Sequence, residues 1–278
     1  MKPAPFAYER PRDLTAALSL LGETAASAKV IAGGQSLGPM LNLRLAAPEL
    51  IVDISALAEL KQAEHHGDEL VLGACVTHAD IEDGRVSDLT RGAMQGIAAN
   101  IAYRAVRNRG TIGGSLSHAD PAADWVSGLA AMGARLTLRS RGGTRIVNVE
   151  DFIVGALESV LRLGEIVETI HIPARSPSAH WGYVKSCRRT GEFAHAIGAV
   201  LIDPNAGKAR VVIGAIEAAP IVLKDPLELF GGHIASDYKD RFDARVADAI
   251  LVKAGVSNAA QRHIHVSVLR RAIREAAA

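Results

Sequence analysis

The spacing of apolar residues along the first third of the chain predicts short strands that alternate with short helices. Residues 14–22 carry apolar side chains at helical spacing, with Asp13 as a candidate N-cap and Gly22 as a candidate stop. Apolar runs predict three strands, over residues 28–31, 50–54 and 69–74. Thr77 is placed to cap the segment that follows the last of these strands.

The middle of the chain shows a different pattern. Residues 97–103 have helical spacing, and residues 104–120 are rich in Gly, Ser, Arg and Asn, which is typical of a long loop. Pro121 suits the first turn of a helix that runs to about Met132, because its missing N–H is not needed there. Three strand-like runs follow, over residues 135–140, 144–149 and 166–172.

Two prolines and two serines within residues 173–179 indicate a boundary between structural units. Beyond it, three further runs predict strands, over residues 181–186, 194–202 and 208–216. From Asp237 to the end the pattern is helical and amphipathic. The length of 278 residues is enough for two modest domains, which agrees with a division at this boundary.

Composition excludes several classes of function. Hydrophobic residues make up 49% and charged residues 22%, as in an ordinary globular protein. The net charge of +1 supplies no excess of either sign for binding nucleic acid or an acidic membrane. Aromatic residues are only 4%, so a stacking platform for single-stranded nucleic acid is not expected.

The sequence also limits targeting and metal chemistry. Residues 1–10 contain no apolar core of a secretory signal, and no run of about 18 uncharged apolar residues predicts a membrane-spanning helix. Only two cysteines occur, Cys75 and Cys187, too few to ligate an ordinary iron–sulfur cluster. His263 and His265 fall on different sides of a helix, so no metal site is expected there. We expect two reduced thiols and a cytoplasmic location.

Two glycine segments are the strongest candidates for chemistry. They read Ile31-Ala32-Gly33-Gly34-Gln35-Ser36-Leu37 and Thr111-Ile112-Gly113-Gly114-Ser115-Leu116-Ser117. Glycine lets a backbone approach phosphate closely, and the hydroxyl groups add hydrogen-bond donors, so two such loops could hold a pyrophosphate between them. Neither segment fits the dinucleotide fingerprint G-x-G-x-x-G or the P-loop.

Structural roles compete with the functional ones at this stage. A Gly-Gly pair more often marks a turn than a binding site. Asp120 could cap the helix that follows it, and Asp124 could either stabilise the helix dipole or accept hydrogen bonds from ribose hydroxyls. His118 could act as a general base, although a lone loop histidine more often has a scaffold role.

Taken together, these motifs closely resemble one family, the FAD-binding medium subunits of molybdenum hydroxylases. This family includes the carbon monoxide dehydrogenase medium subunit and the flavin domain of xanthine dehydrogenase. The resemblance covers nearly the whole chain in order. It is carried by residues 32–36, 106–114, 119–124, 164–173 and 185–189.

The resemblance implies an α+β fold. It consists of a two-part FAD-binding domain of the vanillyl-alcohol-oxidase, or PCMH, type and a small α+β C-terminal domain like that of carbon monoxide dehydrogenase flavoproteins. The expected bounds are 1–176 for the FAD-binding domain, with parts at about 1–57 and 58–176, and 177–278 for the C-terminal domain.

The resemblance also implies the cofactor-binding residues. Both glycine segments would wrap the FAD pyrophosphate, and Asp124 would bind the ribityl or ribose region. Apolar residues would line the cofactor, Lys185 would lie at the polar ring edge, and Phe193 matches a tyrosine that covers one ring face in some relatives. The full set is Ala32, Gly33, Gly34, Gln35, Ser36, Leu37, Ile101, Thr111, Ile112, Gly113, Gly114, Ser115, Asp124, Ile166, Val167, Lys185 and Phe193.

As a function, the resemblance implies an electron-transfer subunit without catalytic residues of its own. The partners would be a large subunit with the molybdenum cofactor and a small subunit with [2Fe–2S] clusters, as a dimer of heterotrimers. The large subunit would oxidise an N-heterocycle, an aldehyde or carbon monoxide, and FAD would pass the electrons to an external acceptor. Two alternatives remain open: a free-standing FAD-dependent reductase of the same fold, and a non-catalytic assembly module.

Overall fold

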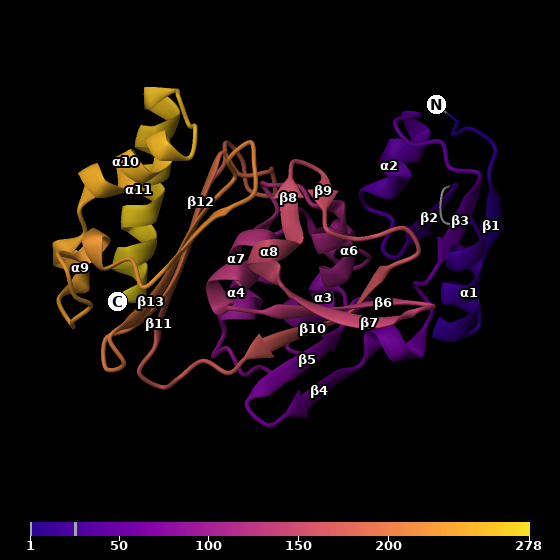
Figure 1. The fold of residues 1–278 in the computed structure, drawn as a ribbon, viewed down its shortest axis with the longest axis horizontal. Helices are drawn as coiled ribbons and strands as arrows, with labels where there is room; N and C mark the ends of the chain where they lie inside the picture. Colours follow the sequence, from indigo (N-terminus) through magenta and orange to yellow (C-terminus); the bar gives the residue numbers. More distant parts are fainter. Residues whose placement is uncertain (1, 25–26) are drawn as a thin grey trace.

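The computed structural model describes residues 2–24 and 27–278. Its first sheet has three parallel strands in the order β1 (Ala7–Glu9), β3 (Leu50–Asp53), β2 (Ala28–Ile31). One helix, α1 (Leu14–Thr24), packs its apolar face against this sheet, and α2 (Leu37–Asn42) lies above it (Figure 1). Since β2 leads directly into residues 32–36, the sheet fixes the start of the first glycine segment.

The predicted strands at residues 28–31 and 50–54 are confirmed, and Asp13 accepts a hydrogen bond from the Ala16 amide at 2.8 Å. The predicted stop at Gly22 is wrong, because α1 continues to Thr24. Gly22 remains helical, and a helix interior tolerates glycine at a cost of about 1 kcal/mol.

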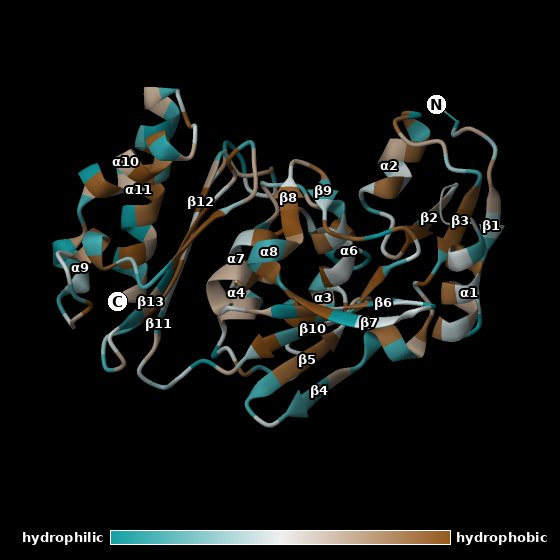
Figure 2. Ribbon diagram, viewed as in Figure 1, coloured by the Kyte–Doolittle hydropathy of each residue, from teal (hydrophilic) through white to brown (hydrophobic). Residues whose placement is uncertain are grey.

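The second sheet is antiparallel and has five strands. Their order is β4 (Ala63–His66), β5 (Glu69–Gly73), β10 (Ile166–Pro173), β6 (Arg135–Ser140), β7 (Gly143–Asn148). A small hairpin, β8 (Ile153–Gly155) and β9 (Glu158–Ser159), follows the single turn of α8 (Val149–Phe152). β10 is coloured as largely apolar in Figure 2, whereas the edge strand β4 is largely hydrophilic.

Five helices accompany this sheet: α3 (His78–Glu82), α4 (Ala93–Ala99), α5 (Arg104–Arg107), α6 (Ile112–His118) and α7 (Asp124–Met132). The buried α7 and α4 supply much of the central core. Thr77 caps α3 in a capping box with Asp80, as its position in the sequence predicts.

Three predictions in this region are wrong. The helix expected over residues 97–103 ends at Ala99, since Ala102 takes a left-handed backbone conformation with φ of 42°. The loop expected over residues 104–120 contains α5 and α6. The helix expected from Pro121 starts at Asp124 with Ala123 as N-cap, because the Asp120 carboxylate binds the Ala122 amide in a local turn instead.

The third sheet is antiparallel, in the order β11 (His180–Ser186), β12 (Ala196–Asp203), β13 (Lys208–Gly214), β14 (Ile221–Lys224). Alternate residues of its central strands face opposite ways: Ala199 and Val212 join the core with α7, and Val200 and Val211 join the core with α11 (Ala259–Ala276). The sheet is therefore covered by helices on both faces (Figure 1).

The C-terminal helical region is divided into three helices, α9 (Tyr238–Arg241), α10 (Ala244–Lys253) and α11, preceded by the 3-10 turn η2 (Leu227–Phe230). A second 3-10 turn, η1 (Ala58–Lys61), links the first two sheets. Helices and mostly antiparallel sheets define an α+β fold. No helix in the described part of the chain has the length and hydropathy to cross a membrane.

Candidate functional site

The first glycine segment, residues 32–36, connects β2 to α2 as a loop. Gly34 has a φ of +71°, a left-handed conformation that favours glycine. Within the described residues, the backbone N–H groups of Gly34, Gln35 and Ser36 donate to no protein acceptor. Ser36 occupies the N-cap position of α2 but makes no capping hydrogen bond. This loop therefore presents free donors.

The second glycine segment consists of the N-cap Thr111 and nearly all of α6, so the expectation of a second loop is wrong. Thr111 is its N-cap and accepts a hydrogen bond from the Gly114 amide at 3.1 Å. The amides of Ile112 and Gly113 donate to the carbonyls of Val76 and Ala74, both at 3.0 Å. These amides are already satisfied, whereas Gly114 is exposed and Ser115 is half-buried.

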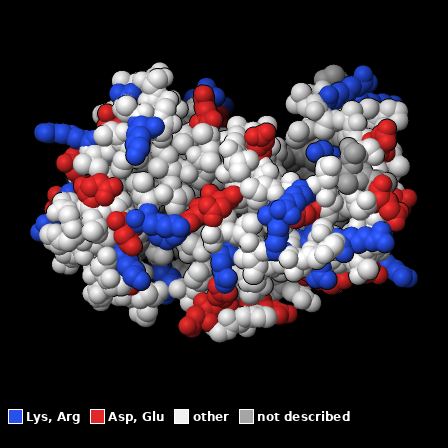
Figure 3. Space-filling view, in the orientation of Figure 1, with Lys and Arg blue, Asp and Glu red and all other residues white. Residues whose placement is uncertain are grey.

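Backbone contact brings the first segment against residues 109 and 110, directly before the second segment. A Cβ atom on Gly33 would lie 2.0 Å from the carbonyl oxygen of Arg109, so no side chain fits between these two stretches of backbone. Gly33 is buried, and the loop that follows it opens toward solvent. The surface is hollowed between the part of the molecule with α2 and the part with the β8–β9 hairpin (Figures 1 and 3). The first glycine segment and the chain that leads into α6 therefore lie side by side.

An arginine anchors the chain that leads to the second segment. Arg107 donates through Nε and Nη2 to both carboxylate oxygens of Glu82, at 2.8 and 2.9 Å. Its Nη1 donates to the carbonyls of Ile101 and Ala102 at 2.9 and 3.1 Å. The pKa of Glu82 is lowered by these hydrogen bonds, with Arg107 as the main cause. The clamp places Ile101 and residues 108–111 relative to α3.

His78 is a second anchor, and sequence reasoning missed it. Its buried ring packs against Gly110, where a Cβ atom would lie 2.9 Å from the imidazole. Its Nδ1 accepts a hydrogen bond from Nε1 of Trp125 at 3.1 Å. Burial, together with nearby Arg107, lowers the pKa of His78 to about 4, so the ring is neutral at pH 7. The position directly after the capping residue Thr77 was its only sequence signal.

Asp124 and Lys185 meet at the junction of the second and third sheets. Lys185 Nζ lies 2.9 Å from Asp124 Oδ1 and donates to the Asn100 carbonyl at 2.7 Å. The Tyr183 hydroxyl donates to Asp124 Oδ1 at 2.7 Å. Both charged side chains are about nine-tenths buried. Burial raises the pKa of Asp124, and Lys185 opposes this rise. Asp124 and Lys185 are both candidates from the sequence, whereas Tyr183 was not predicted.

The remaining candidates are placed as follows. Phe193 is 65% exposed, and its neighbour Gly191 lies against Ala102 and Tyr103, close to Ile101 in the chain. Ile166 and Val167 are only 3% exposed and belong to two different core clusters. Their side chains line the core, and both residues pair with β6 inside the second sheet.

A flavin dinucleotide fits the residues that are present. The free amides and the Ser36 hydroxyl supply neutral donors of the kind that hold a pyrophosphate. Gly114 is exposed, and a Cβ atom there would lie 2.8 Å from the Thr111 hydroxyl oxygen, so glycine avoids a close contact at this surface. The Asp124–Lys185 pair supplies one acceptor and one cation for polar parts of the cofactor.

Comparisons with known proteins show the family to which the chain belongs. Residues 4–175 match the family described as the FAD binding domain in molybdopterin dehydrogenase. The beta subunit of caffeine dehydrogenase from Pseudomonas sp. (strain CBB1) is 36% identical over 80% of this chain and 76% of its own length.

Solved structures give the same result. Reconstituted CO dehydrogenase from Oligotropha carboxidovorans contains a chain with a TM-score of 0.88 and 28% identity, covering 100% of this chain and 99% of that chain. Quinoline 2-oxidoreductase from Pseudomonas putida 86 contains one with a TM-score of 0.85 and 29% identity, covering 100% and 98%.

The chain therefore belongs to the family of FAD-binding domains of molybdopterin dehydrogenases. It is a medium, FAD-binding subunit of the molybdenum hydroxylase type, and FAD is its cofactor. The class of activity is that of an oxidoreductase, and the resemblance stated from the sequence motifs is confirmed.

Proposed function

We propose that this chain carries electrons between two partners of a heteromeric molybdenum hydroxylase. Electrons arrive one at a time from [2Fe–2S] clusters of a small subunit and leave through FAD to an external acceptor. The substrate is oxidised at the molybdenum cofactor of a large subunit, and the complex is a dimer of heterotrimers. The two free cysteines support a cytoplasmic location.

The observation that carries this proposal is the backbone contact of Gly33, in the first glycine segment, with Arg109, two residues before the second segment. It holds a loop with free amides beside the chain that enters α6, where Gly114 is exposed, and we place the pyrophosphate between these two parts. The chain offers this cradle together with only two cysteines, so the clusters must be held elsewhere.

Each part of the site has a proposed role. Residues 32–37 and 111–115 hold the pyrophosphate, and Asp124 accepts hydrogen bonds from the ribityl or ribose hydroxyls. Lys185 places its cation at the polar edge of the flavin ring, while Ile101 and Phe193 contact its apolar parts. Ile166 and Val167 complete the apolar lining beside the cofactor. No residue of this chain has a catalytic role in substrate oxidation.

FAD supplies the conversion between one-electron and two-electron chemistry when it is bound. The protein's task is to bind, orient and shield it. Lys185 is held by Asp124 and the Asn100 carbonyl, so its ammonium is fixed in position. A fixed cation near the ring favours added negative charge, which makes reduction easier.

The substrate class follows from the relatives by analogy alone. Caffeine and quinoline, which appear in the names of two relatives, are N-heterocycles, and the name of a third relative refers to carbon monoxide. We propose that the substrate of the complex is an N-heterocycle, an aldehyde or carbon monoxide. Its binding pocket lies in the large subunit, outside this chain.

The test is anaerobic reduction of the complete complex with candidate N-heterocycles, aldehydes and carbon monoxide, following the cluster and flavin absorbance. We expect the flavin to bleach only when the molybdenum subunit is present. Equal bleaching of the isolated chain by an organic substrate would instead identify a free-standing reductase. Acid precipitation of the purified chain should release one FAD per chain to the supernatant, and failure to reconstitute any flavin would favour an assembly module.

A further inference from the structure

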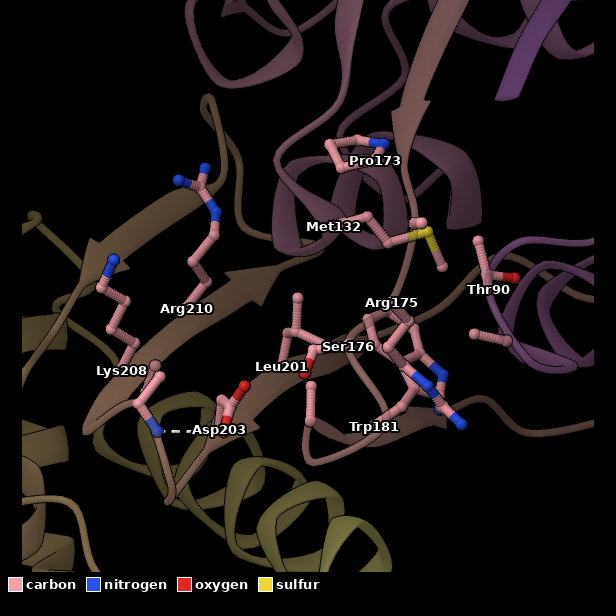
Figure 4. A pocket seen from close by; sticks show the side chains of 15 residues that line it. Thr90, Met132, Pro173, Arg175, Ser176, Trp181, Leu201, Asp203, Lys208 and Arg210 are labelled. Carbon is pink, nitrogen blue, oxygen red and sulfur yellow. Dashed lines mark hydrogen bonds between the residues drawn. The ribbon is translucent and has the colours of Figure 1, made fainter. Parts of the chain in front are cut away.

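A cavity of about 250 Å³ lies between the second and third sheets, away from the glycine segments. Its apolar walls are Met132 at the end of α7, Pro173 at the end of β10, and Trp181 and Leu201 on β11 and β12. Figure 4 shows these side chains around one space, with Arg175 on the same side as Thr90. The function proposed above does not use this cavity.

Arg175 is the unusual group in the lining. Its Nε atom is buried and has no hydrogen-bond partner, and its Nη2 reaches only the Arg91 carbonyl at 3.5 Å. Within residues 2–24 and 27–278, no carboxylate lies within ion-pair distance of its guanidinium. Burial lowers the pKa of Arg175, the neighbouring Arg91 adds to this effect, and the charge of Asp88 opposes it. The partly exposed guanidinium therefore has no carboxylate as a direct partner in the described part of the chain.

The two nearby carboxylates are committed to other donors. Asp88 accepts hydrogen bonds from the Thr90 amide and hydroxyl, at 2.7 and 2.6 Å, and from the Gly92 amide. Asp203 accepts from Ser178 Oγ at 3.0 Å and from the amides of Asn205 and Ala206. In Figure 4, Asp203 lies apart from the Arg175 guanidinium. The guanidinium is thus left for an external anion.

We propose that this cavity binds a small organic carboxylate with a flat apolar body. The carboxylate pairs with the free Nε and the Nη groups of Arg175, which present a planar fork of donors. The ring lies against Trp181, Leu201 and Met132. The volume exceeds the ~150 Å³ in which a protein cavity holds benzene, so one substituted ring fits.

Side-chain contacts connect this cavity with Asp124 of the proposed flavin site. Trp181 is stacked on Tyr183, with ring centroids 6.3 Å apart and planes inclined by 5°. The Tyr183 hydroxyl donates to Asp124, which is a candidate flavin-site residue. The walls come from both the second and the third sheet, and a ligand there would contact the two parts that hold Asp124 and Lys185.

Benzoate is the first probe, titrated into the full FAD-loaded chain by calorimetry and by tryptophan fluorescence. Trp181 is the useful reporter, because the other tryptophan, Trp125, is fully buried. We expect saturable binding of benzoate and weaker binding, by about tenfold, of neutral benzamide and of ringless acetate. The fluorescence change should disappear in Trp181→Phe.

Arg175→Met is the key variant, with Arg274→Met on the exposed face of α11 as its control. We expect Arg175→Met to fold, since it removes an unpaired cation, and to bind benzoate no better than benzamide. Its thermal midpoint and FAD content report folding, and Arg175→Lys should recover part of the preference. Failure of benzoate to bind the wild-type chain, or an unchanged preference in Arg175→Met, would overturn the proposal.

Discussion

The first glycine segment leaves its amides free, whereas the second uses its amides to hold the fold together. Gly34, Gln35 and Ser36 donate to no acceptor within the described chain, while the amides of Ile112 and Gly113 bind carbonyls of the segment before α3. The same dipeptide therefore serves two purposes. Gly33-Gly34 permits contact and exposes donors, and Gly113-Gly114 permits close packing of a helix start.

Steric contacts explain why glycine occurs in both places. A Cβ atom on Gly33 would meet the Arg109 carbonyl oxygen at 2.0 Å, and one on Gly113 would meet the Ala74 side chain at 2.4 Å. The first contact holds the first segment against the chain that leads into α6, and the second holds α6 against Ala74, directly after β5. A glycine pair in a sequence indicates close approach, but it does not reveal which partner approaches.

Substitution of Gly33 should have the largest effect. Because the new Cβ atom meets backbone, Gly33→Ala should lower the free energy of unfolding by about 3 kcal/mol and remove nearly all bound FAD. Gly96→Ala in α4 is the control, since its Cβ atom enters open space. Flavin absorbance per chain and urea denaturation measure both effects. Full FAD content in Gly33→Ala would mean that the segments need not touch.

A comparison of two left-handed glycines separates strain from binding. Gly34 has a φ of +71° and Gly207, in the turn between β12 and β13, has a φ of +64°. Alanine at either position should cost about 1–2 kcal/mol of stability, because an L-residue is strained there. Only Gly34→Ala should also weaken FAD binding, measured by equilibrium dialysis. Equal FAD affinity in the two variants would contradict a binding role for the first segment.

Substitution of the two hydroxyl residues sharpens the contrast further. Thr111→Ala removes a helix cap and should cost about 1 kcal/mol of stability. Ser36→Ala removes no capping bond and should change stability by less than about 0.5 kcal/mol. It should nevertheless weaken FAD binding by up to about tenfold, because a free hydroxyl donor is lost. If Ser36→Ala lowered stability and Thr111→Ala weakened FAD binding instead, Ser36 would be the structural residue and Thr111 the ligand-binding one.

A pH dependence is also expected from the chain directly before the second segment. His78, packed on Gly110, has its pKa lowered from 6.5 to about 4. Above pH 6.5 it is neutral both folded and unfolded, but below it the unfolded chain takes up the proton first. Stability is therefore lost as pH falls from 6.5 toward 4.

His78→Asn stays neutral and keeps an acceptor for Trp125, so urea denaturation should give a shallower pH slope over this range. The slope should not vanish, because burial also lowers the pKa of His171 and His265. An unchanged slope would mean that His78 does not carry the proton linkage.

Local patterns predicted most of the strands, but helix boundaries in the middle of the chain could not be predicted. Alternating apolar runs such as residues 166–172 give a clear strand signal, and the structure places β10 there. α6 was missed because its sequence, Ile-Gly-Gly-Ser, has low helix propensity. Its first turn is instead stabilised by long-range hydrogen bonds to Val76 and Ala74, which local patterns do not encode.

The same limit applies to the candidate site. Motif resemblance placed Asp124 and Lys185 in it, and the structure brings them to 2.9 Å. Tyr183, His78 and Arg107 were missed, because each acts by contact with residues distant in sequence. The domain boundary near residue 176 stays a prediction, although the three sheets fall in three consecutive stretches of the chain.

Hydrogen exchange of individual backbone amides, with and without FAD, tests the central claim most directly. The free N–H groups of Gly34, Gln35 and Ser36 should exchange fast without FAD and become protected when it binds. The amides of Ile112 and Gly113 should be protected in both states, because they are already hydrogen-bonded. Protection by FAD that appears only in residues 112–114, with residues 34–36 unchanged, would contradict the account.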